Sequence, residues 1–342
     1  MIVLLDISAC AKGRNLLFKY VEYNLVSRDM AISDGAKVTI ETCLNVKKGE
    51  RVLVLTDDSK EAIAQHLYQA SLNLGAETIL AKIPDLKVDG QEPPVTIARL
   101  MKEMDVIVIT TEKTMSHTAA RRRATRAGAR VATMPGITVQ MMDGGGMTAD
   151  FKEIRRSIFR VARKLRKARV LRIVTEMGTD LRMDITGRSW ITDDSGICHR
   201  KGDFTNLPAG ELFISPVEGS ANGTLIVDGS FIESLQEPVK VSIKDGIADR
   251  ITGAHDVIKE LNRGGRDARN IAKFGMGLNP NAKLVGILLE DSKVLGTVNI
   301  GFGDNSMFGG NVKSPVHLLG IINKPTVTVD NVLIMKEGEL KA

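Results

Sequence analysis

The sequence predicts an α/β protein in which a parallel βαβ domain is followed by a mixed or antiparallel α+β domain. Two patterns indicate this order. Aliphatic runs alternate with helical segments in the first part of the chain, and short strands separated by Gly, Asp and Asn turns follow in the second. The length of 342 residues fits two domains, since a domain usually has roughly 100–200 residues. We expect an N-terminal extension over 1–29, the α/β domain over 30–148 and the α+β domain over 149–342.

The first domain is predicted from four aliphatic runs and the helices between them. An uninterrupted aliphatic run is typical of a strand buried on both faces of a parallel sheet. Residues 30–50 have helical spacing, whereas 1–29 read as irregular or weakly helical. The predicted strands are 51–56, 77–83, 105–110 and 130–133, and the predicted helices run from Asp58 to about Asn73, from Pro93 to about Met104, and from a Ser116 cap to about Gly128.

The second domain is expected to begin after a glycine-rich hinge, Gly144–Gly146, with a basic helix over about 151–167. Its strands are short, and their spacing favours an antiparallel or mixed sheet. The predicted strands are 170–175, 181–185, 212–216, 225–227, 239–243, 284–289, 295–300 and 326–329, with helices at 255–262 and near 266–273.

The net charge of +6 is concentrated in two segments. Residues 151–172 hold ten basic residues and one acid, Glu153, and residues 121–130 hold five arginines. A basic stripe can meet phosphates, but a solvated helix face is the commoner explanation. Aromatic residues make up only 4% of the chain, which disfavours a surface that stacks nucleic-acid bases. We therefore expect no nucleic-acid partner.

Several other protein classes are disfavoured by missing patterns. No apolar run reaches the ~20 residues that span a bilayer, and the run Met1–Leu5 is shorter than a signal-peptide core of about 7–15 residues. Three widely spaced cysteines form no disulfide framework, so we expect a cytoplasmic protein without membrane contact. The first strand is not followed by GxGxxG, and GxxxxGK[ST] is absent, which excludes Rossmann or P-loop nucleotide binding. The motifs HExxH and GxSxG are absent as well.

Three residues are candidates for chemistry from their positions alone. His117 follows the third predicted strand, where an α/β domain presents catalytic groups, with a structural or exposed histidine as the alternative. Glu211 begins a short apolar strand after a Pro-Gly turn, and its carboxylate is a candidate metal ligand or base, with a solvated strand-end acid as the alternative. His317 follows a glycine-rich loop, and an inward-pointing strand residue is its alternative.

Four segments of the chain closely resemble the leucyl aminopeptidase family typified by aminopeptidase T. A sister branch of that family includes the non-haem iron enzyme 2,5-dihydroxypyridine 5,6-dioxygenase. The resemblance extends from about residue 30 to the C-terminus, and residues 1–29 lie outside it. The four segments are Ser116–Thr138, Asn206–Phe231, Phe274–Asn305 and Phe308–Ile321.

The resemblance implies which positions would hold a metal. Glu211 matches the carboxylate of the NLP-x-x-E turn, His317 matches a ligand histidine, and Asn299 stands where relatives carry another ligand histidine. Leu319 stands where relatives carry Asp, and Lys273 where they often carry Glu. These are departures from a metal site, because leucine has no donor atom, a neutral amide is a weak donor and an ammonium repels a divalent cation.

Three functions follow from this comparison. The first is an aminopeptidase T-like hydrolase that releases N-terminal amino acids with zinc, cobalt or iron, with His117 and Glu211 as catalytic residues. The second is an iron dioxygenase of the extradiol type, in whose branch His117 matches a histidine that lines the substrate pocket. The third is a metal-free pseudoenzyme or binding protein without a cofactor. The expected partners are a small molecule or a peptide, and the resemblance implies a homo-oligomer.

Overall fold

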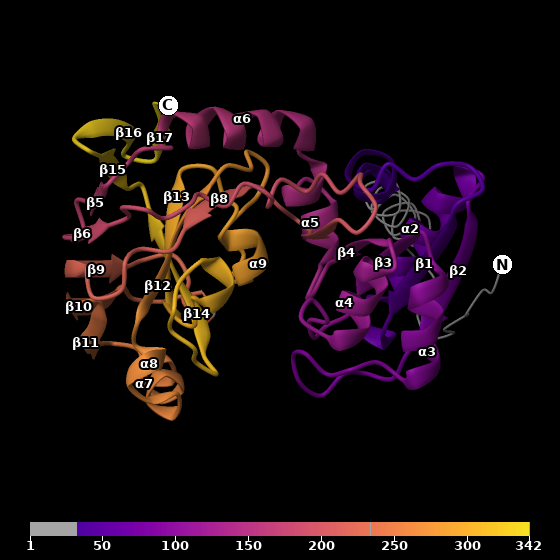
Figure 1. Ribbon diagram of the computed structural model, residues 1–342, viewed down its shortest axis with the longest axis horizontal. Helices are drawn as coiled ribbons and strands as arrows, with labels where there is room; N and C mark the ends of the chain where they lie inside the picture. The colour runs from indigo at the N-terminus through magenta and orange to yellow at the C-terminus, as the bar shows by residue number, and fades with distance from the viewer. Residues whose placement is uncertain (1–32, 233, 342) are drawn as a thin grey trace, which may run out of the picture.

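The computed structural model describes residues 33–232 and 234–341, which form two lobes (Figure 1). One lobe contains a parallel sheet of five strands flanked by helices, and the other contains sheets of eight and four strands whose neighbours are antiparallel. The predicted α/β class, with a parallel part followed by an antiparallel part, is confirmed. The predicted extension over 1–29 lies outside the described residues.

The strand order of the parallel sheet is β2-β1-β3-β4-β7. Strand β3 is buried along its whole length, as its aliphatic sequence predicts. The edge strand β7 comes from the sequence range assigned to the second domain, so the chain returns to the first lobe and pairs in parallel with β4. The bounds are β1 Arg51–Thr56, β2 Glu77–Lys82, β3 Val106–Thr110, β4 Arg130–Thr133 and β7 Phe204–Asn206.

Helices cover both faces of the parallel sheet. Val52 and Val54 of β1 pack with the residues of α2, whereas Leu53 and Leu55 pack with those next to α3 and α4, because successive side chains of a strand point to opposite faces. The bounds are a π-helical segment Val38–Cys43, α2 Glu61–Asn73, α3 Val95–Leu100, α4 Ala119–Arg126 and α5 Val139–Met142.

Helix α4 begins differently from the prediction. Thr118, and not Ser116, is the N-cap, because its hydroxyl accepts a hydrogen bond from the backbone N–H of Arg121 at 3.2 Å. The Ser116 hydroxyl instead donates to Asn206 Oδ1 at 2.8 Å. Ser116 therefore connects the start of this helix to β7.

The second lobe is organised around the eight-stranded sheet, in the order β11-β10-β9-β6-β5-β15-β16-β17. Helix α6 lies along this lobe and reaches towards the first (Figure 1). The Asp150 carboxylate caps it by accepting hydrogen bonds from the N–H groups of Lys152 and Glu153. The bounds are β5 Val170–Val174, β6 Asp180–Asp184, β9 Asn222–Val227, β10 Val239–Lys244, β11 Ile247–Thr252, β15 Thr326–Val329, β16 Val332–Lys336, β17 Glu339–Leu340, α6 Phe151–Lys164, α7 His255–Arg263 and α8 Gly265–Ala268.

The four-stranded sheet has the order β14-β13-β12-β8 and corrects two predictions. The helix predicted near 266–273 ends at Ala268, because the following segment is a strand buried at every position. The strand predicted at 284–289 is a loop and the start of α9, since the backbone N–H groups of Val285 and Gly286 bind the Asp291 carboxylate. The bounds are β8 Glu211–Ile214, β12 Ile271–Gly277, β13 Thr297–Gly303, β14 His317–Asn323 and α9 Leu288–Asp291.

None of the helices within the described residues combines the length and the apolar character that a bilayer-crossing helix needs.

Candidate functional site

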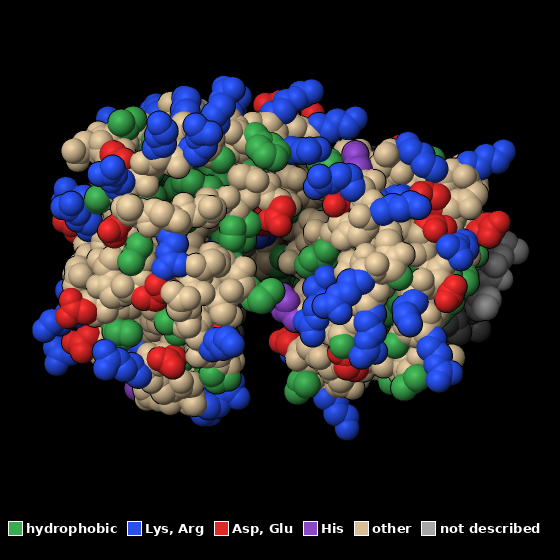
Figure 2. Space-filling model, viewed as in Figure 1, with side chains coloured by type: hydrophobic (Ala, Val, Ile, Leu, Met, Phe, Trp, Pro, Cys, Tyr) green, Lys and Arg blue, Asp and Glu red, His purple; other side chains and the backbone are tan. Residues whose placement is uncertain are grey.

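A cavity of about 570 Å³ lies between the two lobes, where the surface is deeply hollowed (Figure 2). The first lobe supplies the loop before α4, helix α4 itself and strand β7. The second lobe supplies β8, β12, β14 and neighbouring loops. A hollow beside the carboxyl ends of parallel strands is the usual place for a ligand in an α/β fold. The residues that carry its chemistry are His117, Arg122, Asn206, Asp194, Glu211, Lys273, Lys293, Asp304 and His317.

One face of the four-stranded sheet forms a wall of this cavity. Residues directly opposite each other in an antiparallel sheet point to the same face. Lys273 of β12 lies opposite Gly301 of β13, and Gly301 lies opposite Leu319 of β14. His317 of β14 lies opposite Gly303 of β13. Glycines therefore occupy several positions between the long side chains, and they keep this face open.

Gly275 shows why a side chain is not tolerated at such a position. A Cβ atom there would lie 2.0 Å from Oε1 of Glu211 and 2.7 Å from Oδ1 of Asn299. The glycine thus makes the space in which the Glu211 carboxylate sits.

Glu211 is the centre of a buried charge network and is only 1% exposed. Its Oε1 atom lies 2.5 Å from Nζ of Lys273 and accepts a hydrogen bond from Nδ2 of Asn299 at 2.9 Å. Its Oε2 atom lies 2.8 Å from Nζ of Lys293, which also pairs with Asp194 at 2.7 Å. Two ammonium groups and two carboxylates therefore balance one another inside the protein.

The network perturbs each of its members differently. Burial alone would raise the pKa of Glu211, but the charges of Lys273 and Lys293 outweigh it and lower that pKa to about 2. Burial likewise opposes the charge of Lys293, yet its two carboxylate partners raise the pKa. Lys273 has one carboxylate partner, and burial lowers the pKa of its amine. Lys273 is therefore the more easily deprotonated of the two lysines.

His317 lies on the same wall as Lys273. Its Nδ1 is 3.1 Å from the carbonyl oxygen of Asp304, and a carbonyl only accepts, so the proton is assigned to Nδ1 and Nε2 keeps a free lone pair. The imidazole is accessible from the cavity, but the protein around it displaces most of the surrounding water. This desolvation, together with the charge of Lys273, lowers the pKa of His317 to about 4. The ring is therefore neutral at pH 7.

The opposite wall is built from the first lobe. His117 lies in the loop before α4. Desolvation of its ring lowers its pKa, and the charges of Arg121 and Arg122 lower it further. The Asn206 amide is oriented from behind, because its Oδ1 accepts hydrogen bonds from Ser116 Oγ and from Thr133 Oγ1 at 2.6 Å. The cavity thus has a histidine on each side.

The structure brings the residues predicted from the sequence to one place, at different depths. Glu211, His317 and His117 all line the cavity, whereas Asn299 is fully buried beneath Glu211. Sequence reasoning missed Lys293 and its partner Asp194, which are 99 residues apart and belong to no recognisable spacing.

The donor set does not fit a metal ion. Both oxygens of Glu211 are already bound by ammonium groups, and the side chain of Leu319 has no donor atom. The amide of Asn299 turns its N–H towards Glu211, and its buried Oδ1 has no hydrogen-bond partner among the described residues. Within the same part of the chain, three or more His, Cys, Asp or Glu side chains are nowhere grouped to hold an ion.

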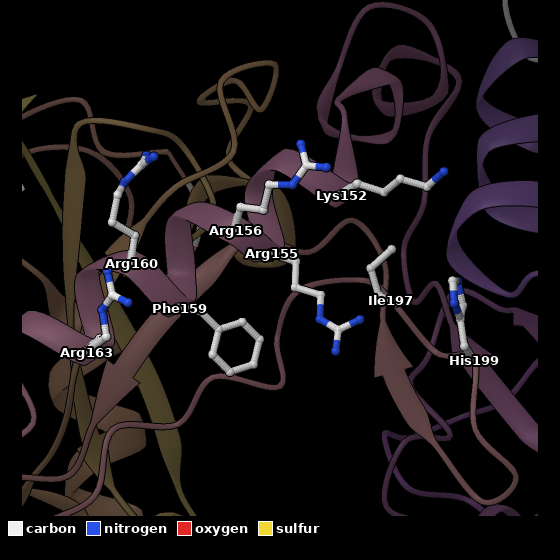
Figure 3. A pocket seen from close by; sticks show the side chains of 8 residues that line it. All are labelled: Lys152, Arg155, Arg156, Phe159, Arg160, Arg163, Ile197 and His199. Atoms are coloured by element: carbon white, nitrogen blue, oxygen red, sulfur yellow. The ribbon is translucent and has the colours of Figure 1, made fainter.

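A second hollow, of about 800 Å³, runs along α6 (Figure 3). We call it the α6 groove, and it is lined by Lys152, Arg155, Arg156, Phe159, Arg160, Arg163, Ile197 and His199. Arg155 reaches from the helix towards Ile197, and Phe159 is 48% exposed. No carboxylate is among these lining residues, so the groove offers a basic, partly apolar surface and lacks the paired acid and base of the cavity.

Comparison with known proteins identifies the family from the sequence and the shared fold from solved structures. The chain matches the NicX family of 2,5-dihydroxypyridine 5,6-dioxygenases over residues 35–342. It is 24% identical over 270 residues to the 2,5-dihydroxypyridine 5,6-dioxygenase of Pseudomonas putida, which covers 71% of this chain and 73% of that protein.

Two solved structures share the fold. The 2,5-dihydroxypyridine dioxygenase of Pseudomonas putida KT2440 has a TM-score of 0.74 at 20% identity, covering 91% of this chain and 97% of that one. AmpT from Thermus thermophilus has a TM-score of 0.69 at 16% identity, covering 92% and 99%. The resemblance to the aminopeptidase T-like family and its dioxygenase branch is confirmed, and the dioxygenase branch is better supported than the aminopeptidase. The match over nine-tenths of the chain shows that it belongs to the NicX family, the 2,5-dihydroxypyridine 5,6-dioxygenases.

Proposed function

We propose that this chain binds and converts a small polar molecule in the cavity between its lobes without a bound metal ion. The observation that carries the proposal is the occupancy of Glu211: Lys273 and Lys293 take up both carboxylate oxygens at 2.5 and 2.8 Å. A divalent cation would have to displace these ammonium groups and would leave the buried network with excess positive charge. Metal chemistry of the kind implied by the family is therefore not carried over.

The cavity is large enough for a small-molecule ligand such as a single substituted ring. The dioxygenase of Pseudomonas putida named above acts on a dihydroxypyridine, and a volume of about 570 Å³ lies within the range of small-molecule pockets. Lys273 presents its charge beside the Phe213 ring, 4.4 Å from the centroid, where an anionic oxygen of the ligand would be held. His317 provides a neutral nitrogen that can accept a proton, and His117 faces it from the other lobe.

Metal content and metal-dependent stability test the proposal directly. The purified protein should contain far less than one equivalent of iron, zinc or cobalt, and adding these ions should not raise its melting temperature. As a matched variant, Lys273→Glu combined with Leu319→Asp restores two carboxylates to the same wall and should gain metal-dependent stability. Near-stoichiometric metal in the unsubstituted protein, or a clear upward shift with added ion, would overturn the proposal.

The second candidate is iron-dependent ring cleavage, which the family relationship favours. Ring cleavage requires iron to bind at the cavity wall that carries Lys273. Among the described residues of that wall, His317 is the imidazole that could hold it. The same titration with ferrous iron separates it from the metal-free proposal. Release of N-terminal amino acids has less support, because the sequence match is to the dioxygenase. Homo-oligomerisation and a cytoplasmic location stay predictions.

A further inference from the structure

Lys273 combines three features that bear on the reactivity of its amine. Its side chain is only 6% exposed, yet it lines the cavity. A carboxylate oxygen lies 2.5 Å from its Nζ, and a second ammonium, that of Lys293, is bound to the same carboxylate. Desolvation and a neighbouring cation are the two conditions that activate a lysine amine as a nucleophile.

We propose that Lys273 is a catalytic residue that forms an imine with the carbonyl group of a small oxo acid. This deepens the proposed function and rests on it, because a metal bound to Glu211 would displace the lysine. The substrate class follows from the two walls: a carbonyl carbon meets the amine on β12, and a carboxylate or similar anion meets Arg122 on the first lobe.

The covalent step balances without an added oxidant or reductant. The nitrogen of Lys273 forms a bond to the carbonyl carbon and gives a carbinolamine, whose C–O bond then breaks. Two hydrogens that began on the ammonium leave with the oxygen as water, and one positive charge stays on the iminium. Glu211, which remains an anion, stabilises the positive charge before and after the step.

Two neighbours support this reaction in different ways. His317 has an unprotonated Nε2 on the same wall and can move the protons that the dehydration needs. Lys293 is held by both Glu211 and Asp194 and keeps its proton, so it acts as the fixed charge and not as the nucleophile. The geometry therefore distinguishes two lysines that share one carboxylate.

Reductive trapping on the full-length protein tests the inference. The protein is incubated with cyanoborohydride and either formaldehyde, a carbonyl that needs no recognition, or pyruvate, an anionic one. Peptide mapping then compares Lys273 with Lys152, an exposed lysine of the α6 groove. We expect faster modification of Lys273 than of Lys152 with both reagents, and loss of the label at position 273 in Lys273→Arg, which keeps the charge beside Glu211.

Modification of Lys273 no faster than that of Lys152 would overturn the imine. Mapping on the unsubstituted protein gives this answer even if Lys273→Arg does not fold. Metal content measured on the same sample keeps the two proposals apart: an unlabelled, metal-free protein contradicts the imine alone, whereas bound metal contradicts the metal-free function as well.

Discussion

The cavity and the α6 groove are both rich in cations, but they treat charge in opposite ways. In the cavity, Lys273 and Lys293 are less than a tenth exposed, and carboxylates pair with both. Beside the groove, on the same helix, Glu153 is half exposed and is the acid that pairs with Arg156 and Arg160. The buried cations must be paired because their desolvation is expensive, whereas the exposed ones are stabilised by water.

This difference indicates where chemistry is to be expected. A paired and buried amine responds strongly to a single lost partner or to a ligand, and its reactivity is set by the protein. An exposed arginine on a helix face is screened by salt and behaves much as it does in water. The number of basic residues, which is higher along α6, is therefore a poor guide to the functional site.

The largest expected effect is the loss of the anion between the two buried lysines. Glu211→Gln leaves Lys273 and Lys293 without their shared carboxylate and should lower the free energy of unfolding by about 3–5 kcal/mol. The matched change on α6, Glu153→Gln, removes an exposed pair and should cost about 0–1 kcal/mol. Denaturant unfolding measures both variants, and equal small losses would contradict the distinction between the two regions.

A smaller loss is expected when the space beneath Glu211 is filled. Gly275→Ala places a methyl group within 2.0 Å of Oε1 of Glu211, and the resulting displacement should cost about 1–3 kcal/mol. Ser157→Ala, at a partly exposed position of α6 whose hydroxyl accepts a hydrogen bond from Arg160, should change stability by no more than about 0.5 kcal/mol. A neutral Gly275→Ala would mean that the carboxylate can move without losing its partners.

The pH dependence of stability should report the low pKa of His317. The ordinary value is 6.5 and the folded value is about 4, so the unfolded chain binds more protons between these limits. The contribution of His317 is fully present above pH 6.5 and is lost as the pH falls towards 4. His317→Gln should flatten the stability profile in this window, as followed by thermal unfolding, and an unchanged slope would show that the imidazole is not desolvated.

The smallest effect on stability is expected in the groove, where the informative measurement is binding to a polyanion. Replacing Arg155 and Arg160 by Gln should change the free energy of unfolding by no more than about 0.5 kcal/mol. The same variant should elute from a heparin column at lower salt, because fewer exposed cations meet the polyanion. Unchanged elution would show that these arginines contribute nothing to the field of the groove.

Much of the first lobe could be predicted because its signals are local. The uninterrupted aliphatic run 51–56 is enough to predict a buried strand, and the spacing of apolar residues in the segment after it is enough to predict the helix. The misplaced elements have non-local causes. The segment near Lys273 reads as a helix until β8 and β13 are seen on either side of it. Residues 284–289 read as a strand until Asp291 is seen to bind their backbone.

The sequence by itself determined the alternation of strands and helices, the family resemblance and the presence of Lys273, Asn299 and Leu319 where that resemblance implies metal ligands, because each depends on residue type and order alone. Only the tertiary structure decided what those replacements do. Lys293 is 82 residues from Glu211 and Asp194 is 99 residues from Lys293, so no spacing links them. Their contact arises because backbone hydrogen bonds hold the loops of Asp194 and Lys293 against the start of β8 and the end of β12, where the charges are buried together.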